Sequence, residues 1–330
     1  MGILRQEAME KINAITHPAP HHADETFATA MLQFLFPEVN LVRTRDPEMI
    51  DSAKNAIIYD VGGVFDPEKK RFDHHQRDFA EVRPDGTKYS SAGLIWREYG
   101  VDIVFAVGGS KVIDAGMANE VVDRVDRNLV KGIDARDNGQ GEEIGAMSVS
   151  AAISVFNPLW DENEDDDACF AFAVNVASMI LEREIKYEIS SVHGCRLTEE
   201  AIEASDGPIM VMDRFIGGWL EAVLTSDSPK AADLLYAVFQ GKDGNWDVQA
   251  IPPSLENRTG QRKPFPEEWR GLRGGKSSQE FRVSEVPSSA MWQGSSLWRR
   301  RKTMRLRLQT KQPSIPPNFI KKRSEQSGRF

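Results

Sequence analysis

Histidines and carboxylates gather in two short segments of this sequence. Five of its six histidines lie in residues 16–25 (THPAPHHADE) and 72–76 (FDHHQ). Between these segments, Asp60 directly follows the apolar run AIIY. Imidazole nitrogens and carboxylate oxygens together suit Mn²⁺, Zn²⁺, Fe²⁺ or Co²⁺. The pattern therefore predicts a site for divalent cations.

Two neighbouring cations would give this site hydrolytic chemistry. His22 and Asp24 lie in a loop from which they can face different ions, and Asp60 can bridge two ions with its two oxygens. A pair of ions about 3.5–4 Å apart can hold a hydroxide and clamp a phosphoryl oxygen. Each residue alone would more often be structural, as when a single Asp caps a helix. Taken together, they predict a metal-dependent hydrolase that acts on phosphoesters.

Alternating helices and strands are expected to position these residues. Apolar residues spaced at i, i+3, i+4, i+7 and i+8 over 27–35 predict an amphipathic helix after the first segment. Short strands are expected at 40–44 and 56–59, and helices at 90–99 and 112–133. The second strand ends at Asp60, and open α/β sheets bind ligands at the carboxyl ends of their strands. The alternation predicts an α/β layered-sheet domain over residues 1–150.

The rest of the chain divides into three expected parts. Residues 151–195 form a helical connection, in which the acidic run 161–167 (DENEDDD) is expected to be a solvated helix cap. A strand and then a hairpin around the turn GKDGN predict a smaller α/β domain over 196–274. Residues 275–330 form a basic tail, which is expected to be disordered.

Charge is distributed unevenly along the chain. The formal net charge is −9, yet residues 275–330 contain 13 Lys/Arg and 3 Asp/Glu, a balance of +10. The other 274 residues therefore carry −19. An acidic body repels phosphate unless bound cations offset its charge locally. For the tail, the alternative to disorder is an arm that binds nucleic acid.

Composition favours a cytoplasmic protein with no membrane partner. The sequence has no apolar run of about 18 residues that would span a bilayer, and its N-terminus lacks the apolar core of a signal peptide. Cys169 and Cys195 are expected to be reduced thiols. The oligomeric state is left open.

Six motifs lie in order between about residue 14 and residue 273. They are Thr16-His17 with His22-Ala23-Asp24-Glu25, YDVGG at 59–63, RFDHHQR at 71–77, SSAGLI at 90–95, DARDNG at 134–139 and RKPFPEEWRGL at 262–272. Jointly they resemble the DHH superfamily of phosphoesterases and, more closely, its Myg-type exonuclease branch. The resemblance ends after Arg273, and a reading-frame change in the gene near Gly275 would explain why.

The resemblance implies a fold and a set of residue roles. It implies a DHH-like domain followed by a smaller α/β domain, with two divalent ions, usually Mn²⁺, in the cleft. Asp73 would orient the two neighbouring histidines, and His75 would serve the scissile phosphate as hydrogen-bond donor or general acid. The implied ligands are His17 and His22 for one ion, Asp24, His74 and Asp137 for the other, and Asp60 as the bridge.

Two further assignments follow from the same resemblance. Asp137 is preferred to Asp134 as the ligand, because Asp-Asn-Gly at 137–139 resembles the Asp-Thr-Gly of the family motif. Asp134 would then support the site from behind. Arg262 would contact a substrate phosphate from the smaller domain. One departure is Pro18-Ala19-Pro20, where the family usually has Gly, and it is expected to stiffen the loop after His17.

The expected substrate is the 3′ end of an RNA, because the Myg-type branch is associated with 3′→5′ exonuclease activity. One alternative uses the same chemistry on a small substrate, as a phosphatase or pyrophosphatase. An alternative of another class is a non-catalytic protein that binds metal or nucleotide.

Overall fold

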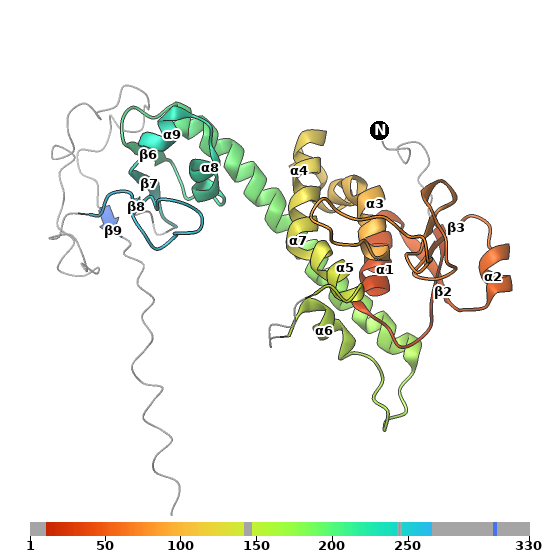
Figure 1. Ribbon diagram of the computed structural model, residues 1–330. Helices are drawn as coiled ribbons and strands as arrows, with labels where there is room; N and C mark the ends of the chain where they lie inside the picture. The colour runs from red at the N-terminus through yellow and green to blue at the C-terminus, as the bar shows by residue number, and fades with distance from the viewer. Residues whose placement is uncertain (1–10, 142–146, 243, 245, 266–305, 309–330) are drawn as a thin grey trace, which may run out of the picture. The chain divides into compact units, whose positions relative to one another are not determined.

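The computed structural model describes residues 11–141, 147–242, 244, 246–265 and 306–308. The chain divides into two compact units, and the division falls between His193 and Gly194 (Figure 1). The 38-residue helix α7 (Asp166–Glu203) contributes residues to both units. Within the described ranges, no helix is both long enough and apolar enough to cross a bilayer.

The first unit contains a five-stranded sheet in which three neighbouring strand pairs are parallel. Its order is β2-β1-β3-β5-β4, and only the pairing of β4 with β5 is antiparallel. The carboxyl ends of β1, β3 and β5 therefore lie at one edge, where such sheets bind ligands. The strands are β1 (Lys11–Thr16), β2 (Glu38–Arg43), β3 (Ala56–Tyr59), β4 (Phe65–Asp66) and β5 (Arg71–Phe72).

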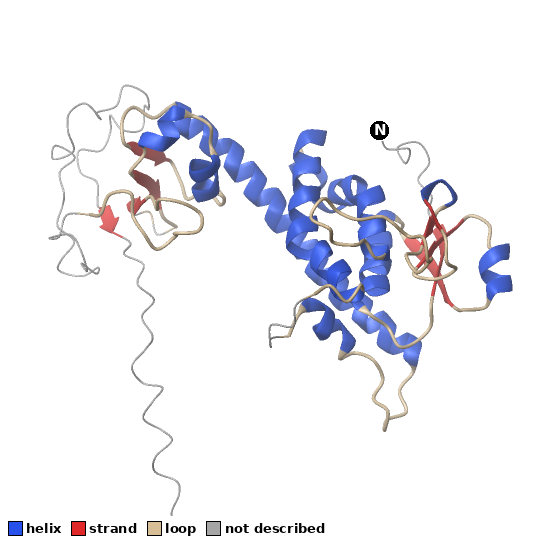
Figure 2. Ribbon diagram, in the orientation of Figure 1, coloured by secondary structure: helices blue, strands red, loops and turns tan. Residues whose placement is uncertain are grey.

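Both faces of this sheet are covered. Ile57 and Tyr59 of β3 belong to the main core with residues of α1 and α3, whereas Ile58 packs with Ile50 of α2. This alternation follows from the strand geometry, which points successive side chains to opposite faces. Figure 2 shows the strands between the helical body and the short helix α2. The helices are α1 (Ala23–Leu35), α2 (Pro47–Ser52), α3 (Ser91–Gly108), α4 (Ala115–Val125), α5 (Lys131–Asp137) and α6 (Val149–Ser154), with helical turns at Pro67–Lys69, Gly109–Lys111 and Asp126–Val130.

The second unit is built on a four-stranded sheet in the order β6-β7-β8-β9. Strands β7 and β8 form the antiparallel hairpin that the sequence predicts. Its core contains Met210, Trp219, Leu234 and Phe239, all buried. The elements are β6 (Ile209–Met212), α8 (Trp219–Thr225), α9 (Pro229–Asp233), β7 (Tyr236–Gln240), β8 (Trp246–Ala250) and β9 (Leu306–Leu308).

The mixed α/β class with a largely parallel sheet agrees with the prediction, and the strand at 56–59 has the predicted bounds. One strand was missed, because the sequence predicted no element over β1, although β1 lies between β2 and β3 in the sheet. The tail was expected to be disordered, yet its residues 306–308 pair with β8 in parallel, because an open strand edge offers unpaired N–H and C=O groups. The other residues of 275–330 lie outside the described part of the chain.

The start of α3 lies against a buried carboxylate. The Gly93 N–H donates to Asp134 Oδ1 at 3.0 Å, and a Cβ added at Gly93 would come within 1.8 Å of Asp134 Oδ2. Asp134 also lies 2.7 Å from Nη1 of Arg83. Because Gly93 and Arg83 both contact the carboxylate of Asp134, it cannot move aside to make room for a new side chain at Gly93.

Replacing Gly93 by Ala should therefore lower the free energy of unfolding by about 2 kcal/mol or more through overpacking. The matched control is Gly132→Ala in α5, where a new Cβ has no neighbour within 4 Å. That change should raise stability by about 0.5–1 kcal/mol through helix propensity. Urea unfolding of both variants measures the difference. Equal stabilities would show that α3 is not held against Asp134.

Candidate metal centre

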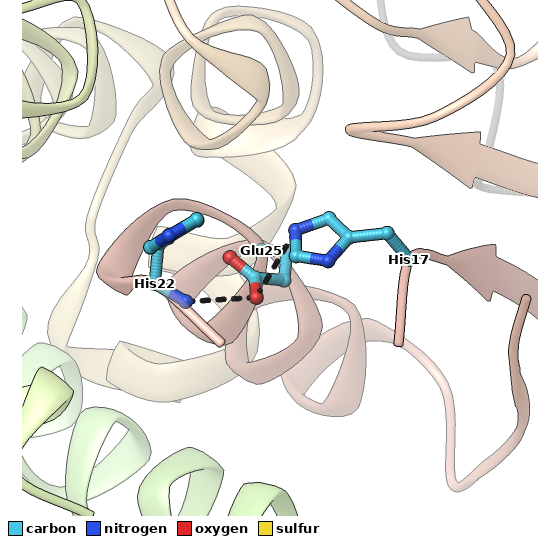
Figure 3. A group of neighbouring side chains, drawn as sticks. All are labelled: His17, His22 and Glu25. Atoms are coloured by element: carbon cyan, nitrogen blue, oxygen red, sulfur yellow. Dashed lines mark hydrogen bonds and ion pairs between the residues drawn. The ribbon is translucent and has the colours of Figure 1, made fainter. Parts of the chain in front are cut away.

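His17, His22 and Glu25 meet where β1 ends and α1 begins (Figure 3). Nε2 of His17 lies 3.3 Å from Oε1 of Glu25, and this oxygen also accepts the His22 backbone N–H at 2.9 Å. Each of the three residues can offer a ligand atom within 4.8 Å of the others. The sequence prediction missed Glu25 as a member of the group. The loop containing Pro18-Ala19-Pro20 still brings His17 to the edge of the sheet.

Asp60 lies between this group and a second one. It follows β3 with a φ of 57°, a left-handed conformation that is uncommon for residues other than Gly. Its Oδ2 is 3.1 Å from Nε2 of His17, and its Oδ1 is 3.4 Å from Nε2 of His74. Each carboxylate oxygen thus faces an imidazole from a different segment of the chain.

The second group surrounds His74 with carboxylates. Nε2 of His74 lies 3.2 Å from Oδ2 of Asp137 and 3.8 Å from Oδ2 of Asp24, in addition to its contact with Asp60. Asp24, His74 and Asp137 can each offer a ligand atom within 4.8 Å of the others. Asp134 is fully buried and contacts Arg83 and the start of α3. Of the two aspartates in α5, the structure therefore brings Asp137 to this group.

The start of α3 holds Asp24 in place. Oδ1 of Asp24 accepts the Ser90 hydroxyl and the Ala92 N–H, each at 2.5 Å, and its Oδ2 accepts the Ser91 N–H at 3.0 Å. Backbone N–H groups at a helix N-terminus stabilise a neighbouring negative charge. The motif SSAGLI therefore holds the carboxylate of Asp24 in position through these hydrogen bonds.

Asp73 orients the second histidine of the pair. Its Oδ1 accepts the N–H groups of His74 and His75 at 2.7 and 3.1 Å and Nδ1–H of His75 at 2.8 Å. Its Oδ2 accepts the Gly63 N–H at 2.5 Å. Burial alone would raise the pKa of Asp73, but the hydrogen bonds outweigh this effect and lower its pKa. The hydrogen bond from His75 to Asp73 in turn raises the pKa of His75. Because Nδ1 of His75 is used, its Nε2 is left to face a substrate.

Burial and mutual repulsion shift the acidity of the cluster. Burial raises the pKa of Asp24 well above its usual range, and the charges of Asp60 and Asp137 raise it further. Burial, followed by the charge of Asp60, also raises the pKa of Glu25 well above its usual range. Burial would lower the pKa of His74, but the carboxylates of Asp137 and Asp60 outweigh it and raise the pKa to about 11.

Asp60 behaves in the opposite way. Its burial would raise its pKa, yet the neighbouring imidazoles of His17 and His74 lower the pKa below its usual range. Asp60 is therefore ionised at neutral pH, and it is buried at the centre of the cluster. A buried carboxylate in this position needs positive charge beside it.

The residues fit a divalent cation on two observations. Nδ1 of His17 lies 2.7 Å from the Pro18 carbonyl, which can only accept, so Nδ1 carries the hydrogen. Nε2 of His17 lies 3.1 Å from Asp60 and 3.3 Å from Glu25, so a cation held by this nitrogen would have two carboxylates beside it. In addition, Glu25 Oε2 is buried without a hydrogen-bond partner among the described residues.

A pocket of about 480 Å³ opens onto the cluster. Two arginines line it, Arg45 after β2 and Arg136 in α5. His75, whose side chain is 61% exposed, lines it as well. The pocket therefore combines groups that can ligate a metal ion with cationic side chains of the kind that bind phosphate.

Arg262 lies in the second unit and supports its backbone. Its Nη1 donates to the carbonyls of Ala231, Ala232 and Leu234, at 2.6, 3.3 and 2.9 Å. These bonds fix the chain at the end of α9. A contact between Arg262 and substrate remains a prediction.

Comparison with solved structures gives only a weak likeness. A crystal structure of RecJ in complex with Mn²⁺ from Thermus thermophilus aligns at 16% identity over 74% of this chain and 46% of that chain. Its TM-score of 0.20 is too low to support any conclusion about the fold.

Comparison of sequences is decisive. The family model described as "Uncharacterised protein family (UPF0160)", MYG1_exonuc, matches residues 13–287. The MYG1 exonuclease of Mus musculus is 34% identical over 284 residues, covering 78% of this chain and 73% of that protein. MYG1 protein C694.04c of Schizosaccharomyces pombe is 34% identical over 289 residues, covering 81% and 87%. The matches confirm the resemblance to the Myg-type branch, and this chain belongs to the MYG1 exonuclease family of nuclease-type hydrolases.

Proposed function

We propose that this chain is a metal-dependent exonuclease that removes nucleotides from the 3′ end of RNA. The observation that carries the proposal is the position of Asp60, whose two oxygens face His17 and His74 from different segments. Family membership supports the hydrolase class, because relatives in this family are named exonucleases. RNA and the 3′→5′ direction rest on the resemblance to the DHH superfamily and its Myg-type branch.

The cluster offers ligands for two divalent ions, with Mn²⁺ as the first to test. His17 and His22 would hold one ion with Glu25 beside them, Asp24, His74 and Asp137 would hold the other, and Asp60 would contact both. Bound ions would supply positive charge beside the phosphate oxygens and lower the pKa of a water molecule.

The protein's own side chains would bind and orient the substrate. His75 donates Nδ1–H to Asp73, so its Nε2–H is available to the scissile phosphate or to the oxygen that leaves. The raised pKa of His75 favours the protonated form that this role needs. Arg45 and Arg136 line the same pocket and would hold flanking phosphates, which the acidic body would otherwise repel.

End-labelled RNA tests the reaction and its direction. With Mn²⁺, RNA labelled at its 3′ end should release labelled mononucleotide from the first time point. RNA labelled at its 5′ end should shorten through a ladder. Fragments from internal cleavage, or hydrolysis of pyrophosphate alone, would contradict the proposal. The same assay with DNA measures the preference between the two nucleic acids.

Asp60→Asn should keep the fold and remove most activity, because a neutral amide cannot offset charge between two cations. The expected loss of turnover is at least about 100-fold, or about 2.7 kcal/mol of barrier. Asp51→Asn on the exposed side of α2 is the matched control and should leave turnover unchanged. An Asp60→Asn variant that keeps near-wild-type turnover and full metal content would refute the two-metal assignment.

His74 and His75 should differ although they are adjacent in the sequence. His75→Ala should lower turnover and leave the bound Mn²⁺ near two ions per chain, because Nε2 of His75 is assigned to the substrate. His74→Ala should lower both, since its Nε2 faces three carboxylates. Atomic absorption after gel filtration measures the metal. Equal metal loss in the two variants would show that the roles are divided wrongly.

Protons should compete with cations for the cluster. The pKa of His74 is raised to about 11, so His74 is protonated at neutral pH, and a cation can bind its Nε2 only after this proton leaves. The pKa of Asp24 is raised as well, which strengthens the competition. Mn²⁺ affinity should therefore rise as pH rises, and Mn²⁺ binding should release protons at pH 7. Asp60, with its lowered pKa, should release none. Calorimetry in buffers of different ionisation enthalpy counts the protons, and zero release would contradict this account.

A further inference from the structure

The loop that carries His17 and His22 is held by a side chain from a distant part of the sequence. Asn157 follows α6 and lies 136 residues after His21. Its Oδ1 accepts the His21 backbone N–H at 2.7 Å, and its Nδ2 donates to the His21 carbonyl at 2.7 Å. A single amide side chain thus satisfies both backbone polar groups of His21 in the loop.

This two-point contact fixes the loop more firmly than one hydrogen bond would. An N–H can only donate and a carbonyl can only accept, so the partner must offer an acceptor and a donor side by side, as an amide does. Nδ2 of Asn157 also donates to the Ser154 carbonyl at 3.1 Å, which ties the amide to the end of α6. The His21 ring is fully buried and packs edge-on against Phe170, with 5.7 Å between ring centroids.

The contact acts on one of the two candidate cation positions. His21 directly precedes His22, whose N–H donates to Glu25, and Glu25 in turn lies beside His17. A shift of the His21 backbone would therefore disturb all three members of that group. The other group does not depend on Asn157 in the same way, because the N–H groups of Ser91 and Ala92 hold its Asp24.

We infer that Asn157 is a positioning residue for the His17–His22–Glu25 subsite, and that it sets the affinity of this subsite for a divalent cation separately from the Asp24–His74–Asp137 subsite. The inference rests on the proposed function in treating the two groups as cation subsites.

Two variants of the full chain test the inference. Asn157→Ala removes both contacts with His21. Asn157→Asp keeps the acceptor but places a carboxylate oxygen against the His21 carbonyl, so it tests the same contact in a side chain of nearly the same size. The matched control is Asn40→Ala, whose amide donates to Asn13 on an exposed part of the sheet.

Mn²⁺ titration should give two binding steps in the wild type. In both Asn157 variants one step should weaken by about 10–100-fold, as is typical when the support of a ligand is lost, and the other should stay unchanged. The paramagnetic resonance signal of a coupled Mn²⁺ pair should then require more Mn²⁺ to appear. Asn40→Ala should match the wild type in both steps.

Amide hydrogen exchange in metal-free protein provides an independent measurement. Because the His21 N–H donates to Asn157, peptides covering residues 17–25 should exchange faster in Asn157→Ala, and peptides covering 90–96 should not. Equal weakening of both Mn²⁺ steps, or unchanged binding and exchange, would overturn the inference. A wild-type chain that binds no Mn²⁺ would instead overturn the proposed function, and the exchange data would still decide whether Asn157 holds the loop.

Discussion

Negative charge is concentrated at the carboxyl edge of the sheet in the first unit. Asp24, Glu25 and Asp60 are almost completely buried there, and imidazole nitrogens lie between them. Burial of one ionised carboxylate is costly unless a positive charge lies beside it, and several together also repel one another. The cluster is therefore stable only when it holds protons or cations. The pKa values of Asp24 and His74 are accordingly raised, which means that both groups bind protons more tightly than usual.

The fold provides what this cluster needs. Parallel pairing of β1, β3 and β5 brings the residues that follow each strand to one edge, although they are far apart in the sequence. The start of α3 then holds Asp24 through N–H groups, and Asp73 holds His75. Asp60 keeps an uncommon backbone conformation at the centre, which proteins retain where the surroundings enforce it. Because backbone groups and neighbouring side chains hold the site in this way, few of its members can move independently.

Much of this arrangement could be predicted from local sequence. The apolar run at 56–59 indicated the strand before Asp60, and the spacing over 27–35 indicated the helix after the first histidine segment. Glu25 was missed because an acidic residue in the first turn of a helix is ordinarily explained by the helix dipole. Asn157 could not be found in this way, since no local pattern links residues 136 apart. The pairing of 306–308 with β8 likewise depends on an open strand edge that the sequence does not show.

We propose that Asp60 lies between two cation positions. Crystals grown with Mn²⁺, with diffraction recorded at wavelengths on both sides of the manganese absorption edge, test it most directly. We expect two anomalous peaks roughly 3.5–4 Å apart, one next to His17 and His22 and the other next to His74 and Asp137, with an oxygen of Asp60 in contact with each. A single peak, or two peaks that Asp60 does not join, would contradict it.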